Sequence, residues 1–107
     1  MSTFTPGVGG IPVSTITNVP VSGTSYTVLP TDWSKQIETS NSSAVTITID
    51  ATSLVGIKPG SIVLVTQAGT GGVVFTGVGV TIRNAPALFQ YGTGGLQLKA
   101  NGEVWGI

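Results

Sequence analysis

Side chains that commonly perform catalysis are scarce in this sequence. Cysteine and histidine are both absent, which excludes thiol nucleophiles, imidazole bases, disulfides and the usual zinc or copper ligands. Two carboxylates that flank a sugar would suit glycoside hydrolysis, but no two of the acidic residues stand in a recognisable motif. Asp50 ends an expected strand and Glu103 follows an expected turn, which favours solvated edge positions. We therefore expect no enzymatic activity, no catalytic residue, no cofactor and no metal site.

Two Gly-Thr-Gly-Gly segments, at residues 69–72 and 92–95, carry backbone amides that could cradle a phosphate. A P-loop ends in Gly-Lys-Ser/Thr and leads into a helix, and neither feature follows these glycines. We interpret both segments as tight turns.

The aromatic residues Trp33, Trp105, Tyr26 and Tyr91 could form a platform that stacks against a sugar ring. The competing interpretation places Trp105 in the core, on the last strand, and Tyr26 at a sheet edge. We favour the core for Trp105. For Trp33, which lies in an expected turn, both interpretations stay open.

Charge is low and balanced, with four basic and four acidic residues and a formal net charge of zero. Charged residues form 7% of the chain, against about a quarter of an ordinary soluble domain. Nucleic-acid binding needs clustered Lys and Arg, so we expect no nucleic-acid partner. Neutral polar residues can solvate such a surface, and we expect part of it to be buried against partner subunits.

Neither a membrane span nor an export signal is visible. The apolar run Ile62-Val63-Leu64-Val65 is far too short to cross a membrane as a helix. The first ten residues carry neither the basic nor the apolar region of a signal peptide. We expect no membrane partner and synthesis without Sec export.

Residues 1–20 are rich in Pro and Gly and should form neither a helix nor a central strand. They could be a flexible tail, but their apolar content favours an extended arm that orders on a partner. The candidate docking residues of this arm are Phe4, Pro6, Val8, Ile11, Val13 and Ile16.

Residues 21–107 read as short β-branched strands separated by turns, which predicts an all-β fold, a compact antiparallel β-sandwich or barrel-like module. Val45 to Ile49 alternate with period two and predict a half-buried strand. Ile62 to Val65 do not alternate, so this strand should be central and covered on both faces. The expected strands are Ser25–Leu29, Lys35–Thr39, Ala44–Ile49, Ser61–Gln67, Val73–Thr76, Val80–Arg83, Leu96–Ala100 and Glu103–Ile107.

Turn chemistry joins the last two expected strands, because Asn101-Gly102 tolerates positive φ and predicts a terminal hairpin. Residues 30–34 could form one helical turn capped by Thr31 or Asp32. The recurring segments have no fixed period, so we do not expect a solenoid or β-helix. Few charges protect the strand edges, which favours an obligate oligomer with cyclic symmetry.

An ordered series of short motifs runs from residue 26 to residue 107. In chain order they are Tyr26-Thr27-Val28-Leu29, Asp32, Lys35-Gln36-Ile37-Glu38, Val45-Thr46-Ile47, Pro59-Gly60-Ser61-Ile62-Val63-Leu64-Val65 with Gln67 and Gly69, Gly79-Val80-Thr81-Ile82, Leu96-Gln97-Leu98-Lys99, Asn101-Gly102 and Val104-Trp105. This series resembles a β-rich module of tailed-bacteriophage structural proteins. Trp33, where a small residue is expected, and Asp50-Ala51-Thr52, in place of a proline, depart from that pattern in the loops.

The resemblance implies a homotrimer of the kind found in head decoration (cement) proteins, head fibres and tail fibres. No heptad or shaft repeat is present, which favours a capsid decoration protein. Such a protein would be made in the bacterial host cytoplasm, bind the major capsid protein on the outer head surface and stabilise the lattice. The alternative is a fibre or receptor-binding module that contacts host-surface glycan, with exposed aromatics grouped around Trp33.

Overall fold

The computed structural model describes the backbone of residues 3–5 and 7–8, and residues 15–107 in full. Within these residues no α-helix occurs, and no helix has the length and apolar character needed to cross a membrane. The elements are β1 (Thr3–Thr5), β2 (Gly7–Val8), β3 (Asn18–Val21), β4 (Ser25–Thr27), the 3-10 helix η1 (Pro30–Asp32), β5 (Gln36–Thr39), β6 (Val45–Asp50), the 3-10 helix η2 (Ala51–Leu54), β7 (Ile62–Gln67), β8 (Val73–Val78), β9 (Ile82–Arg83), β10 (Thr93–Leu98) and β11 (Val104–Gly106).

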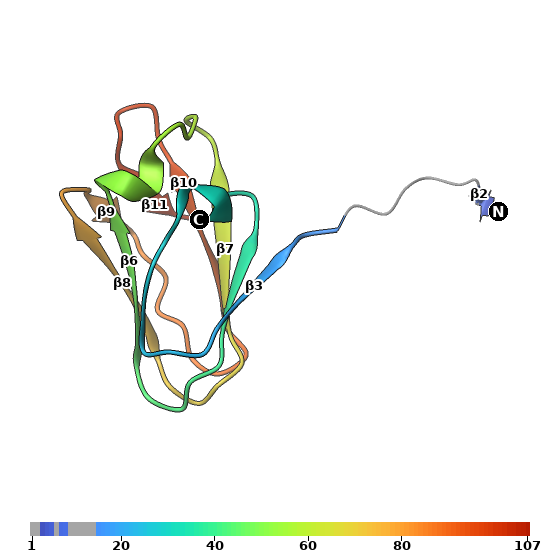
Figure 1. The fold of residues 1–107 in the computed structure, drawn as a ribbon, viewed down its shortest axis with the longest axis horizontal. Coiled ribbons are helices and arrows are strands. Elements are labelled where there is room, and N and C mark those ends of the chain that lie inside the picture. The colour runs from blue at the N-terminus through green and yellow to red at the C-terminus, as the bar shows by residue number, and fades with distance from the viewer. Residues whose placement is uncertain (1–2, 6, 9–14) are drawn as a thin grey trace.

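From β3 to β9 the chain alternates between two sheets. The larger sheet has the strand order β3-β5-β7-β10-β11-β9, and the smaller sheet has the order β4-β6-β8. Successive strands therefore belong to different sheets, and β3 to β8 form a short coil. Each full turn of the coil contributes one strand to the larger sheet and one strand to the smaller sheet. Figure 1 shows β6 and β8 on one side of the molecule and β3 and β7 on the other.

The coil makes neighbouring strands parallel, so the expectation of an antiparallel module is wrong in this respect. β3 pairs with β5, β5 with β7, β4 with β6 and β6 with β8, all in parallel. The physical reason is that a strand meets its sheet neighbour only after one full turn, when the chain again runs in the same direction. The all-β class is confirmed.

We expected no solenoid or β-helix, yet β3 to β8 form a short parallel coil, and the lengths of its turns explain why the sequence does not show it. Paired residues are 18 positions apart between Asn18 and Gln36, but 28 apart between Gln36 and Leu64. Unequal loops absorb the difference, so the sequence shows no fixed period although the strands stack in order.

The larger sheet begins inside the segment that we assigned to the arm, because Asn18 of β3 already pairs with Gln36 of β5. β3 lies at the edge of the sheet. An edge strand tolerates Pro20, which has no backbone N–H to donate to a neighbouring strand. Residues 15–17 precede β3 without regular structure. The rest of the arm lies outside the described residues, apart from the backbone of the short β1–β2 pair.

The predicted terminal hairpin is confirmed. β10 and β11 pair antiparallel, with Leu96 opposite Gly106, Gln97 opposite Trp105 and Leu98 opposite Val104. Gly102 in the connecting turn has a φ of 85°, a conformation that favours glycine. β10 also pairs antiparallel with β7, so the hairpin extends the larger sheet beyond the coil.

The core lies between the two sheets and follows the period of two that the sequence shows. Val45, Ile47 and Ile49 of β6 are fully buried, as are Val63 and Val65 of β7. β7 is central, between β5 and β10, as predicted. Its outward-facing residues are only half-buried in the single chain.

A buried amide closes one end of the coil. Gln67 at the end of β7 is fully buried and accepts hydrogen bonds from the Thr39 hydroxyl at 2.9 Å and from the Gly69 backbone N–H at 2.9 Å. Its Nε2 donates to the Gly71 carbonyl at 2.6 Å. A Cβ on Gly71 would collide with the Ser43 carbonyl oxygen, so residues 69–72 form a close turn between packed loops, as expected. The same interpretation is wrong for residues 92–95, because Thr93, Gly94 and Gly95 belong to β10.

Candidate functional site

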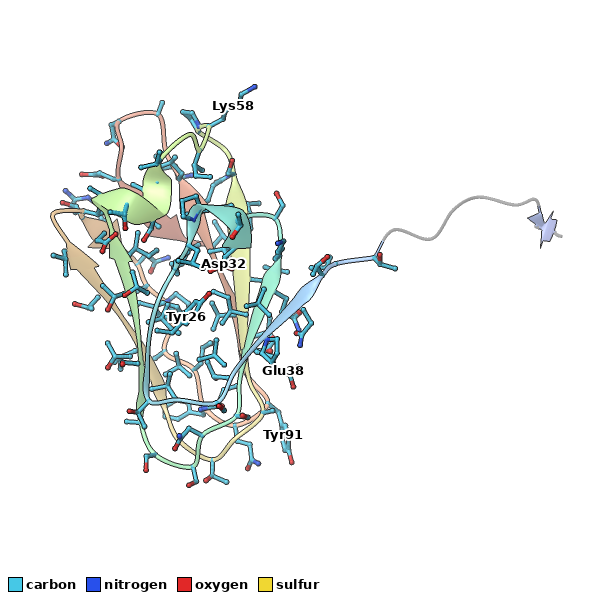
Figure 2. The ribbon with its side chains drawn as sticks, viewed as in Figure 1. Tyr26, Asp32, Glu38, Lys58 and Tyr91 are labelled. Atoms are coloured by element: carbon cyan, nitrogen blue, oxygen red, sulfur yellow. The ribbon has the colours of Figure 1, made fainter. Side chains whose placement is uncertain are left out.

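The four carboxylates do not converge on a common site. Asp32, only 3% exposed, accepts the Tyr26 hydroxyl at 2.6 Å and the Leu29 backbone N–H at 2.8 Å. Figure 2 shows Tyr26 and Asp32 close together, while Glu38 lies on the other side of the larger sheet. Partial burial, reinforced by the hydrogen bond to Asp32, raises the pKa of Tyr26 to about 12. Asp32 therefore fastens η1 to β4.

Asp50 has an equally structural position at the start of η2. Its carboxylate accepts the backbone N–H groups of Thr52 at 2.9 Å and Ser53 at 3.1 Å, which satisfies donors that the helix itself leaves free. The Thr52 hydroxyl hydrogen bond, with these backbone bonds, lowers the pKa of Asp50. The described residues contain no group of three or more acidic side chains suited to a metal ion.

The structure decides the open question for Trp33 and contradicts the expectation for Trp105. Trp33 is buried and donates from Nε1 to the Ser53 carbonyl at 2.9 Å, which joins η1 to η2 and excludes it from an exposed platform. Trp105 is 38% exposed on the outer face of the hairpin, so its expected place in the core is wrong. The signal was present in the hairpin: symmetric pairing around Asn101-Gly102 sets Trp105 opposite the polar Gln97, whereas Val104 faces inward.

Trp105 is held by an ion pair at the hairpin edge. Its Nε1 donates to Glu103 Oε1 at 3.1 Å, and Arg83 on β9 donates to the same carboxylate from Nε at 2.9 Å and Nη2 at 3.0 Å. The hydrogen bonds from Arg83 hold the pKa of Glu103 at about 2. The predicted solvated position of Glu103 fits, but the residue also orients an indole ring.

An apolar groove of about 400 Å³ lies on the outer face of the larger sheet. Its apolar lining comes from Ile16 before β3, Ile62 and Leu64 on β7, and Ile107 after β11. Ile16 and Ile107 are 56% and 59% exposed. The groove rim is formed by Ser34, Lys35, Gly60 and Ser61.

The depth of the groove depends on a glycine in β10. Gly95 pairs with Leu64, and its carbonyl accepts the Ile107 backbone N–H at 3.0 Å. A Cβ at this position would lie 2.8 Å from Ile107 Cγ1 and 3.2 Å from Leu64 Cδ2. Any other residue would therefore push these two apolar side chains apart.

Ile16 is the one predicted docking residue whose side chain the structure describes, and it lines the groove. The other members of the predicted set, Phe4, Pro6, Val8, Ile11 and Val13, have side chains outside the described residues. The groove itself joins residues that are far apart in the chain. The sequence signalled it only through the lack of alternation in Ile62 to Val65.

Comparisons of the chain with protein-family models, with curated proteins and with solved structures found no match.

Proposed function

We propose that this chain is a bacteriophage virion structural protein, a capsid decoration (cement) protein that binds the outer head surface and stabilises the capsid lattice. The single observation that carries the proposal is the open apolar groove on the outer face of the larger sheet, in a chain with few charges. The resemblance of residues 26–107 to phage structural modules is the reason for assigning this binding surface to a phage particle. Its partners would be copies of itself, as a homotrimer, and the major capsid protein.

The groove has the properties of a protein contact. Parallel strands are usually covered on both faces, yet the outer residues of β7 stay half-buried in the single chain. Fully burying an isoleucine contributes about 1.5–3 kcal/mol. Covering Ile16 and Ile107, which are a little over half exposed, would therefore contribute on the order of 2 kcal/mol per contact.

We assign the groove to a neighbouring copy and the predicted arm to the capsid. Ile62 and Leu64 of β7 lie at the centre of the larger sheet, and Ile107 directly follows β11 of the same sheet. The apolar part of the groove is thereby fixed to one sheet, which suits a symmetric partner. Ile16 connects this surface directly to the preceding arm. A trimer would thus present three arms together, and their combined binding would greatly exceed that of one arm.

The test is to mix the purified protein with phage heads that lack it and to measure co-sedimentation and the resistance of the heads to heat. Three versions are compared: the full chain, a truncation of residues 1–14 that keeps β3 intact, and Leu64→Lys. Val55→Lys is the matched control, because Val55 is 67% exposed in a loop outside the groove.

We expect saturable binding and more heat-resistant heads with the full chain and with Val55→Lys. The truncated protein should keep its oligomeric state in sedimentation analysis but lose head binding. Leu64→Lys should become a monomer and bind heads weakly, because one arm replaces three. If heads ignore the full-length protein, the decoration function is wrong, and if Leu64→Lys keeps the native oligomer, the groove is not the contact.

A further inference from the structure

The hollow beside Trp105 is separate from the apolar groove and has a different chemistry. Lys99, Ala100, Asn101 and Trp105 line this hollow, which has a volume of about 430 Å³. None of these residues lines the groove. Lys99 and Asn101 belong to the turn region of the β10–β11 hairpin, so the hollow lies where these two strands of the larger sheet end.

Charge is concentrated around this tryptophan. The chain has only eight charged residues, four of each sign. Three of them surround Trp105: Glu103 and Arg83 along one edge of the indole, and Lys99 with its Nζ 6.0 Å from the ring centroid. Such clustering in a charge-poor protein favours a binding role over general solvation.

The ring is fixed before any ligand arrives. The Glu103 carboxylate accepts a hydrogen bond from the indole N–H of Trp105, and Arg83 donates to both of its oxygens. The backbone N–H of Glu103 donates to Asn101 Oδ1 at 3.0 Å. Because the polar edge of the indole is already satisfied, what remains for a ligand is its apolar face. Rigid aromatic faces ringed by polar groups suit ligands that have both an apolar and a polar side.

Lys99 supplies the unbalanced charge. Its ammonium donates to Gln97 Oε1 at 3.0 Å, and the ion pair of the described residues joins Arg83 to Glu103 and leaves Lys99 out. An exposed cation–π contact contributes only about 0.5–1 kcal/mol. A ligand can therefore displace the ammonium from the ring and pair with it.

We propose that the hollow binds a pyranose ring of an acidic polysaccharide. The apolar C–H face of the sugar stacks on Trp105, the amide of Asn101 hydrogen-bonds to hydroxyl groups, and Lys99 pairs with the acidic substituent. This gives the protein a glycan-binding activity beyond attachment to a capsid. It requires neither the groove nor the arm, so its failure would leave the decoration function standing.

The test uses the full chain on a printed array of bacterial surface oligosaccharides, followed by titration of the best binder monitored by tryptophan fluorescence. The chain has two tryptophans, and Trp33 is only 6% exposed, so a ligand-induced change reports on Trp105. Trp105→Ala, Lys99→Gln and a control, Tyr91→Ala, are titrated alongside. Tyr91 is 82% exposed and lies outside the hollow.

We expect acidic oligosaccharides to bind better than neutral oligosaccharides of the same backbone. Trp105→Ala should weaken binding by about tenfold or more. Lys99→Gln should weaken it about twofold to fivefold and abolish the preference for acidic sugars. Tyr91→Ala should bind as the unmodified chain does. An array without binders, a preference for neutral sugars, or undiminished binding by Trp105→Ala would overturn the proposal.

Discussion

Replacing Gln67 by leucine should test how the fold closes its loop end. The two side chains have similar shapes, so the change removes the amide while filling most of its space. Thr39 keeps a partner, because its hydroxyl also donates to the Thr66 carbonyl at 3.0 Å. The Gly69 N–H and the Gly71 carbonyl, however, lose their bonds to the Gln67 side chain.

An unsatisfied buried polar group costs about 1–3 kcal/mol. Gly71 is buried and Gly69 is half-buried, so we expect Gln67→Leu to lower the free energy of unfolding by about 3 kcal/mol. A domain of this size has a total stability of roughly 5–15 kcal/mol. The melting temperature should fall by roughly 10–20 °C.

The assay is urea unfolding followed by the fluorescence of the buried Trp33, with Gln90→Leu as the control. Gln90 is exposed and makes one long hydrogen bond, 3.4 Å to the Ala68 carbonyl, so its replacement should change stability by less than about 0.5 kcal/mol. Hydrogen exchange at the Gly71 amide should also accelerate in Gln67→Leu. If the two leucine variants are equally stable, the buried amide does not hold the loops and the reasoning is refuted.

Three further results are expected. In a Tyr91→Phe variant the ultraviolet absorbance of the Tyr26 tyrosinate should titrate near pH 12. Because folding raises the pKa of Tyr26 from 10.0 to about 12, the free energy of unfolding should decline as the pH rises between those values. Glu103→Gln should lower the urea midpoint at pH 7 but not near pH 2, because the pKa of Glu103 is lowered from 4.5 to about 2 and its contribution disappears as the pH falls through that interval. Gly71→Ala should cost about 1–3 kcal/mol in urea unfolding because its methyl group meets packed backbone. Gly23→Ala should cost less than about 0.5 kcal/mol, because a Cβ there meets only the Ser25 carbonyl oxygen, at 3.8 Å.

Local burial could be predicted from this sequence, but the direction of strand pairing could not. Alternation in β6 identified its buried face because side chains of a strand point to opposite faces in turn. The same alternation is compatible with a parallel or an antiparallel neighbour. Only the loops decide between them, and the loops of this coil differ by ten residues from one turn to the next.

The candidate site was harder to predict than the fold because its parts are distant in sequence. Ile16, Leu64 and Ile107 meet only when β7, β10 and the end of β11 lie in one sheet. The indole N–H of the buried Trp33 is satisfied by the carbonyl of Ser53, which lies twenty residues away in the chain. No local pattern in the sequence specifies such a partner.

The outer face of the larger sheet carries both of the proposed binding surfaces. The inner face of this sheet is committed to the core, whereas the outer face holds an apolar groove and, at the hairpin edge, a charged aromatic hollow with no lining residue in common. Leu64→Lys should therefore leave the affinity of each hollow for a soluble oligosaccharide unchanged. It should still weaken attachment to a polysaccharide-coated surface, because a monomer offers one hollow where the proposed trimer would offer three. A loss of affinity for the soluble oligosaccharide in Leu64→Lys would show instead that the hollow is completed by a neighbouring copy.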